Sequence, residues 1–282
     1  MTDVQGDEQL ALVVAQVRRA KVRAPAGPAE VDPIARVAVD IPLPHLDRPF
    51  DYLVPEPLSA SAVPGTRVRV RFAGTLVDGW VLERGERSEH TGRMERVAKV
   101  LSPHPVLTPE VAGLARAVAD RWAGTLADVL RAAVPPRHAA AEKALDAAGG
   151  PEPVAVAAPP AGSGPWSAYT GGAALVARLA DVDVAFGAGA PGPRAVWTAG
   201  PGEDPVPALA HLVAAASCAG RGVVVVAPDA RDVARLDCAL TEALGEGRHR
   251  VLSADLGPSA RYRAFLEVCL LYTSDAATNR EV

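Results

Sequence analysis

The side chains best suited to binding chemistry are concentrated between Arg48 and Phe72. There the triplet Phe50-Asp51-Tyr52 places a carboxylate between two aromatic rings, and a later run alternates basic and apolar residues: Arg67, Val68, Arg69, Val70, Arg71 and Phe72. Period-two alternation is typical of a half-buried β-strand, so the three guanidinium groups are expected on one face. Such a stripe can bind the phosphates of a nucleic-acid backbone. It can also be the solvated face of an ordinary strand, which the pattern alone favours.

The overall composition limits the classes of function. The chain has 282 residues, 49% hydrophobic residues and a formal net charge of −4, so a nucleic-acid site has to be a local basic patch. Its three cysteines show no C-x-x-C spacing and its six histidines are scattered, which predicts no metal site and fits a reducing cytosol. No secretion signal is recognised at the start, and no apolar run, including residues 223–227, is long enough to span a bilayer. We therefore expect a cytoplasmic protein.

A β-rich domain is predicted for residues 31–137, after a polar and flexible arm at residues 1–30. Strands are expected at "IARVAVDIPL", at the arginine run and at "MERVAKVLS". Between the last two strands, Asp78-Gly79 is a pair suited to a tight hairpin turn, with apolar residues on either side.

Two helices are predicted to close this domain. Thr108 as N-cap and Pro109 at the first helical position are typical of a helix start. The apolar residues that follow recur at helical spacing: Val111, Leu114, Ala115, Val118 and Trp122. Gly124 separates this helix from a second one at residues 126–133, which ends before two prolines.

After residue 137 the amino-acid composition and pattern divide the rest of the chain into three segments. Residues 138–165 are rich in alanine, proline and glycine and are interpreted as a linker. Residues 166–268 alternate amphipathic segments with short apolar runs such as residues 223–226, which predicts an incomplete α/β domain with a parallel sheet. The compositional bias ends abruptly after Val268, so residues 269–282 are expected to be an unrelated tail, such as a sequencing artefact.

Taken in order, these segments resemble the PriA family of replication restart proteins (primosomal protein N′), and specifically its actinobacterial form. The resemblance covers roughly residues 34–268. It rests on "VAVDIPLPHLDRPFDYLVP", "PGTRVRVRFAG", "DGWVLERG", "VLSPHPVLTPEV", "GPWSAYTGG", "AVWTAGPGEDPVPALA", "GRGVVVVAPDARDVARLDCAL" and "LGPSARYRAFL". It implies that residues 138–165 are either the linker or a degenerate winged-helix remnant. It also makes residues 166–268 a truncated, RecA-like helicase lobe.

The resemblance implies that the β-rich domain binds the 3′ end of a DNA strand at a fork. In this reading Phe50 stacks a terminal base and Asp51 accepts a hydrogen bond from a 3′-hydroxyl or a base amine. The expected DNA-binding set is Phe50, Asp51, Tyr52, Arg67, Arg69, Arg71 and Lys99. The alternatives are hydrophobic core for the two aromatic residues and a turn cap for Asp51. Glu95 stands where many relatives carry a lysine, with Arg93 and Arg96 beside it.

The same resemblance implies ATP and zinc, but neither cofactor is expected on this chain. A phosphate loop of the G-x-x-x-x-G-K-[ST] type should follow the segment at Val196. The residues found there include Gly200, Gly202, Glu203 and Asp204. They lack the lysine and bring two acids to the place of the phosphates, so no nucleotide binding and no catalytic residue are predicted. The family's zinc module would lie beyond residue 282.

Three functions are weighed. The first is a non-catalytic protein that recognises stalled or abandoned forks through a 3′ DNA end and assembles a primosome. Its expected partners are forked DNA, single-stranded-DNA-binding protein, and primosome or replicative-helicase loading proteins, in a nucleoid-associated cytoplasmic location and without a membrane. The second is an ATP-dependent 3′-to-5′ DNA helicase with an unconventional nucleotide site. The third is an unrelated small-molecule binding fold in the α/β part.

Overall fold

A computed structural model describes residues 26–149, 162–183 and 192–278 of the chain, with side chains as far as residue 270. The chain divides into two compact units, with the boundary between Val134 and Pro135. Each unit is described by itself. Residues 1–25, most of the predicted flexible arm, lie outside the described residues.

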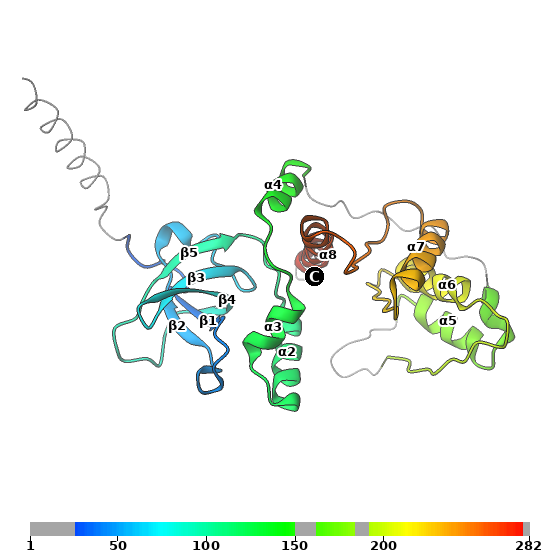
Figure 1. The fold of residues 1–282 in the computed structure, drawn as a ribbon, viewed down its shortest axis with the longest axis horizontal. Coiled ribbons are helices and arrows are strands. Elements are labelled where there is room, and N and C mark those ends of the chain that lie inside the picture. The colour runs from blue at the N-terminus through cyan, green and yellow to red at the C-terminus, as the bar shows by residue number, and fades with distance from the viewer. Residues whose placement is uncertain (1–25, 150–161, 184–191, 279–282) are drawn as a thin grey trace, which may run out of the picture. The chain divides into compact units, whose positions relative to one another are not determined.

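The first unit is built on a five-stranded antiparallel sheet (Figure 1). Its strands are β1 (Ile34–Val39), β2 (Phe50–Leu53), β3 (Arg67–Phe72), β4 (Thr75–Gly85) and β5 (Val97–Ser102), in the order β2-β1-β4-β3-β5. Short 3₁₀ turns, η1 (Pro44–Leu46) and η2 (Glu56–Leu58), flank β2. An isolated bridge between Leu53 and Arg96 joins β2 to the segment before β5. The two outer strands of the sheet therefore meet, and the sheet curls toward a closed barrel.

The interior of this curled sheet is the main core of the unit. It contains the inward residues of every strand, and Val68 and Val70 of β3 are fully buried there, as the alternating pattern predicts. The arginines that alternate with them are half-buried or exposed on the outer face. The strand prediction for residues 67–72 is therefore confirmed.

The hairpin turn between β3 and β4 lies at Ala73-Gly74, so the prediction of a turn at Asp78-Gly79 is wrong. Both turn residues have positive φ angles, +47° and +83°, which a two-residue turn between twisted strands requires. Asp78 and Gly79 instead lie in the middle of β4, opposite Arg69 and Val68. Glycine is needed at position 79 because the backbone of β1 lies very close to it: a Cβ there would be 2.6 Å from the Ala38 carbonyl oxygen.

Residues 26–30 pack on the sheet domain, which corrects their assignment to the flexible arm. The Ala29 N–H donates to the Val54 carbonyl at 2.8 Å, and Pro28 forms a bridge with Pro55. Ala29 is only 4% exposed and belongs to the main core. The polar composition of the arm conceals this contact, because it consists mainly of backbone hydrogen bonds.

Two helices cover part of the outer face of the sheet, as predicted: α2 (Pro109–Trp122) and α3 (Leu126–Ala133). Thr108 caps α2 and Pro109 is its first residue. The residues that pack inward on α2 are small, namely Ala112 and Ala115, and they meet Leu126 and Leu130 of α3 in a second core. The larger apolar residues of α2 are more exposed than the spacing predicts, and Leu114 and Trp122 are 64% and 75% exposed.

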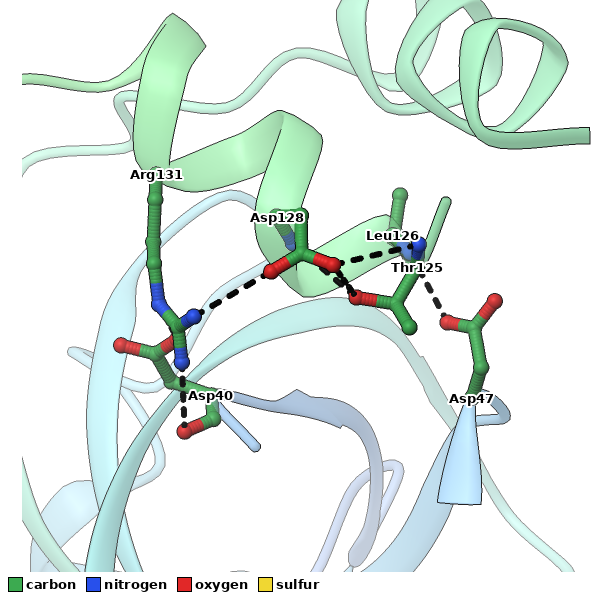
Figure 2. Close-up of polar contacts among 6 residues, drawn as sticks. All are labelled: Asp40, Asp47, Thr125, Leu126, Asp128 and Arg131. Carbon is green, nitrogen blue, oxygen red and sulfur yellow. Dashed lines mark hydrogen bonds and ion pairs between the residues drawn. The ribbon is translucent and has the colours of Figure 1, made fainter. Parts of the chain in front are cut away.

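Polar contacts fix α3 against the sheet, as Figure 2 shows. At its start, Thr125 and Asp128 form a reciprocal capping box. Near its end, the Arg131 guanidinium pairs with the Asp40 carboxylate at 2.6 Å. The N–H of Leu126 donates to Asp47 at 2.9 Å. Both ends of the loop between β1 and β2 are therefore joined to this helix.

The second unit is helical in the part of the chain that the structure describes. Its elements are α4 (Ala139–Ala147), η3 (Gly164–Ala168), α5 (Gly172–Ala180), α6 (Pro205–Cys218), α7 (Ala230–Leu244) and α8 (Pro258–Thr278). Helices α5, α6 and α7 pack in sequence, and α4 packs on α8. The buried hydroxyl of Tyr262 on α8 donates to Glu142 on α4 at 2.7 Å.

Helix α4 differs from the linker predicted for residues 138–165, and α8 runs past the predicted start of the unrelated tail at residue 269. Alanine-rich composition is ambiguous, because alanine is the strongest helix former as well as a common linker residue. His138 caps α4 through its side chain. Residues 150–161 of the predicted linker lie outside the described residues.

The predicted parallel sheet is not confirmed. Residues 223–226 form no strand, and Val224 and Val226 are 87% and 89% exposed. A parallel strand needs neighbouring strands to satisfy its backbone and to bury both of its faces; no strand is assigned to the described residues of this unit. Among the described residues, no helix combines the length and apolar content needed to cross a membrane.

Candidate nucleic-acid interface

The Asp51 carboxylate lies near the surface of the sheet domain and contacts two neighbouring side chains. It lies on β2, an outer strand of the sheet, and its side chain is 16% exposed. One carboxylate oxygen accepts a short hydrogen bond from the Ser88 hydroxyl. The other lies 3.7 Å from the guanidinium of Arg36, which is itself paired with Glu83 at 2.6 Å. Asp51 is therefore held in place but keeps acceptor capacity for a further donor.

Phe50 offers an aromatic surface beside this carboxylate. Its ring meets the edge of Phe72 with centroids 4.8 Å apart, and the Arg48 guanidinium lies 5.0 Å above it. A cation over a ring is attracted to its face. The ring and the guanidinium thus form one stacked surface against which a terminal base can pack.

The triplet is divided between the two faces of β2. Tyr52 lies in the main core and is 3% exposed, and burial together with the Glu95 charge raises the pKa of its hydroxyl to about 12. Phe50 packs on the edge of the same core. Asp51 lies between them in sequence, so its side chain projects to the opposite, outer face. Tyr52 is thus placed in the core, and only Phe50 and Asp51 reach the surface.

The arginines of β3 lie on the outer face but have intramolecular contacts. Arg67 lies 5.1 Å over the ring of Trp80. Arg69 pairs with Asp78 at 2.6 Å, and this hydrogen bond raises its pKa. Arg71 donates to the Gly74 carbonyl at 2.7 Å. Lys99 of β5 is exposed and lies opposite Arg69 in register. The stripe therefore consists of side chains that are already oriented by their neighbours.

A surface hollow of about 430 Å³ connects the end of β2 with this stripe. It lies where the two outer strands of the sheet meet, and it is lined by Leu53, Arg71, Leu76, Arg93, Met94, Glu95, Arg96 and Ala98. Leu53 is two residues from Asp51 and therefore on the same face of β2. Three arginines and one glutamate line this hollow, so its net charge is positive and can attract a phosphate.

Four residues of the site were missed by sequence reasoning: Arg36, Arg48, Ser88 and Phe72. Phe72 is the apolar last residue of the alternating run and packs against the core. Arg48 could have been found from the sequence, because it lies two residues before Phe50 and can therefore reach the Phe50 ring. Arg36 faces Asp51 only because of the register between β1 and β2. Ser88 is 37 residues from Asp51 in the chain, so no local pattern indicates that contact.

In the second unit, the loop at residues 200–204 is where a phosphate loop was expected. A side chain of the loop itself, Glu203, binds the loop backbone there. The Glu203 carboxylate accepts the Gly200 N–H at 2.9 Å and the hydroxyl of Tyr169. These two hydrogen bonds lower the pKa of Glu203. Asp204 caps α6 and pairs with Arg235 at 2.6 Å. The residues present therefore do not fit a nucleotide phosphate, since a carboxylate already holds the loop N–H.

No group of three or more histidine, cysteine or acidic side chains that could hold a metal ion occurs within the described ranges.

Comparison with known proteins gives a family match for the sheet domain. The family model of the PriA 3′DNA-binding domain (3′BD) matches residues 36–135. The "Probable replication restart protein PriA" of Mycobacterium tuberculosis is 48% identical over 224 residues, which are 79% of this chain and 32% of that protein. The protein of the same name from Mycobacterium leprae is 43% identical over 226 residues, 80% of this chain and 33% of its own length.

A more distant relative matches a shorter stretch. The "Replication restart protein PriA" of Bacillus subtilis is 33% identical over 102 residues, or 36% of this chain and 13% of that protein. The chain spans about a third of the length of the mycobacterial relatives. The chain thus contains a 3′DNA-binding domain of the PriA family at residues 36–135, and 79% of its length is similar to part of a replication restart protein named PriA.

Proposed function

We propose that this chain recognises stalled or abandoned replication forks through the 3′ end of a DNA strand and takes part in replication restart. The observation that carries the proposal is the environment of Asp51. Its carboxylate is held by Ser88 on an outer strand, beside an aromatic ring and a hollow with three arginines. A carboxylate repels phosphate, so at a DNA site it favours a strand end with a hydroxyl group.

The arginine hollow and the carboxylate have separate roles in this proposal. Arg71, Arg93 and Arg96 neutralise backbone phosphates and supply affinity without reading the end. Asp51 accepts a hydrogen bond from the terminal hydroxyl or a base amine and supplies the discrimination, while Phe50 stacks the last base. The net charge of −4 keeps this electrostatic attraction local to the hollow.

We propose further that the chain acts without ATP hydrolysis, because Glu203 takes the place of a phosphate at Gly200. In this proposal residues 166–268 correspond to a degenerate RecA-like helicase lobe. The partners would be single-stranded-DNA-binding protein and primosome or helicase-loading proteins, at the nucleoid. Similarity to the PriA proteins supports these finer assignments.

The test uses the full chain and two forked DNAs that differ only in a 3′-hydroxyl or a 3′-phosphate at the branch. Fluorescence anisotropy should show about ten-fold tighter binding of the hydroxyl form, the worth of one hydrogen bond to a charged group. Asp51→Asn should remove most of this preference. Phosphate release from ATP, measured in the same samples, should not rise when DNA is added.

Two control variants separate end reading from backbone binding. Asp78→Asn removes an equal charge from the same sheet and frees Arg69, so both DNAs should bind more tightly and to the same degree. Arg71→Ala, in the hollow, should weaken both and lower the salt dependence by about one phosphate contact. Equal binding of the two DNAs by the unmodified chain would overturn the proposal, and DNA-stimulated phosphate release would overturn its non-catalytic part.

A further inference from the structure

The loop between β1 and β2 is joined to the two helices at both of its ends. At the start, Asp40 receives the Arg131 guanidinium of α3 at 2.6 Å. At the end, one oxygen of Asp47 accepts from Arg116 of α2 at 2.7 Å. The other oxygen accepts the backbone N–H of Leu126 at 2.9 Å, as Figure 2 shows.

The two hydrogen bonds of Asp47 are of the strong, charge-assisted kind. Its side chain is 16% exposed, and the hydrogen bond that it accepts raises the pKa of Arg116. The Leu126 N–H belongs to the first turn of α3, where backbone donors have no partner within the helix and the dipole favours an anion. The carboxylate of Asp47 therefore links α2, α3 and the loop at a single point.

Asp47 is also the last residue before the binding segment. Arg48 follows it directly and lies over the Phe50 ring, and its N–H donates to the Leu46 carbonyl at 2.8 Å. A shift of Asp47 is thus transmitted through one residue to the guanidinium and through three to the ring. By contrast, α3 is held by the packing of Leu126 and Leu130 and by its capping box, none of which needs Asp47.

We propose that Asp47 is a positioning residue for DNA-end recognition: by joining Arg116 and the first turn of α3, it fixes Arg48 and Phe50 in the geometry that the strand end requires. This inference rests on the proposed function. A site held by packed helices is more exact than one on a free loop. The helical pair of this domain is in this view the support of the site rather than a cover of the sheet.

The experiment compares four full-length chains on the hydroxyl and phosphate forks: unmodified, Asp47→Ala, Arg116→Ala and Asp120→Ala. Asp120 is the matched control, because it pairs with the same guanidinium at 2.7 Å but is exposed and does not touch the loop. Asp47→Ala and Arg116→Ala should lose most of the roughly ten-fold preference for the hydroxyl fork, while Asp120→Ala retains it. Salt dependence should be the same in all four, because no phosphate contact is removed.

Two further measurements separate positioning from stability. Thermal melting shows whether each variant is folded, and hydrogen exchange of the peptide that contains residues 48–51 should speed up in Asp47→Ala and Arg116→Ala alone. Asp47→Asn, which keeps an acceptor for Leu126, should recover part of the preference. If Asp47→Ala is unfolded, Arg116→Ala decides the matter.

The outcomes are distinct. If the unmodified chain does not prefer the hydroxyl fork, the proposed function fails and this inference fails with it. If it does prefer that fork and folded Asp47→Ala and Arg116→Ala retain the full preference, only the role of Asp47 is overturned.

Discussion

At the scale of single residues, adjacent side chains of the triplet Phe50-Asp51-Tyr52 lie on opposite sides of the sheet, because successive residues of a strand point to opposite faces. Tyr52 enters the core, whereas the carboxylate of Asp51 projects outward to Ser88 and Arg36. The alternation was available from the sequence, but which face is buried depends on the strands that pair with β2. Tyr52 is therefore part of the core and not of the surface that Asp51 occupies, so its ionisation can be studied separately.

Tyr52 should ionise only in strongly alkaline solution. Burial and the charge of Glu95 raise the pKa of its hydroxyl to about 12, whereas in the unfolded chain it titrates near 10.0. Between these two pH values the native state keeps a proton that the unfolded state has lost. Stability is thus unaffected below pH 10 and falls as pH rises toward 12.

Ultraviolet difference spectra of the unmodified chain and Tyr52→Phe, recorded against pH, isolate this phenolate. The difference between them should develop near pH 12, and Tyr52→Phe should keep the preference for the hydroxyl fork. A phenolate that forms near pH 10, or a loss of preference in Tyr52→Phe, would contradict this placement of the residue in the core.

At the scale of elements, locally encoded features were predicted and long-range ones were not. The alternation of β3 and the cap at Thr108 are determined by neighbouring residues in the sequence, and the structure confirms them. The closure of the sheet and the partner of Asp51 depend on pairings between distant segments, which no local pattern reports. The turn at Ala73-Gly74 was missed because Asp78-Gly79 is the stronger local signal.

Position 79 requires glycine because of a segment that is distant in sequence, and a substitution can test this requirement. A Cβ at position 79 would lie 2.6 Å from the Ala38 carbonyl oxygen and 2.8 Å from a methyl group of Val37, whereas a Cβ at Gly85 meets nothing within 4 Å. Gly79→Ala should therefore destabilise the domain by roughly 1–3 kcal/mol, as other overpacked cores are destabilised.

Gly85→Ala is the matched control for this prediction, because it makes the same chemical change in the same strand, β4. Chemical denaturation of the full chain, followed by tryptophan fluorescence, measures both. Trp80 lies beside Gly79 and is buried, so its signal reports this core. Equal stability of the two variants would show that β1 and β4 do not approach each other as closely as described.

At the scale of the whole molecule, the two units differ in how completely they bury their apolar residues. The first encloses its valines within a curled sheet. The second leaves residues 223–226, a run of four valines, without strand pairing. Their strand character was predicted from a continuous apolar run, whereas β3 was predicted from alternation. A buried parallel strand depends on neighbours that this unit does not supply in the part described.

The exposed valines should give the second unit a measurable affinity for apolar dyes and a tendency to aggregate. Val224 and Val226 are 87% and 89% exposed, so replacing both by threonine, which keeps the shape and the β-branch, should lower dye fluorescence and light scattering without changing the melting of the first unit. Val31→Thr is the control, since Val31 is 73% exposed but stands alone on the sheet domain. If the double variant binds as much dye as the unmodified chain, these valines are covered in solution. Residues 223–226 would then have the neighbours that the sequence pattern predicts for a buried strand.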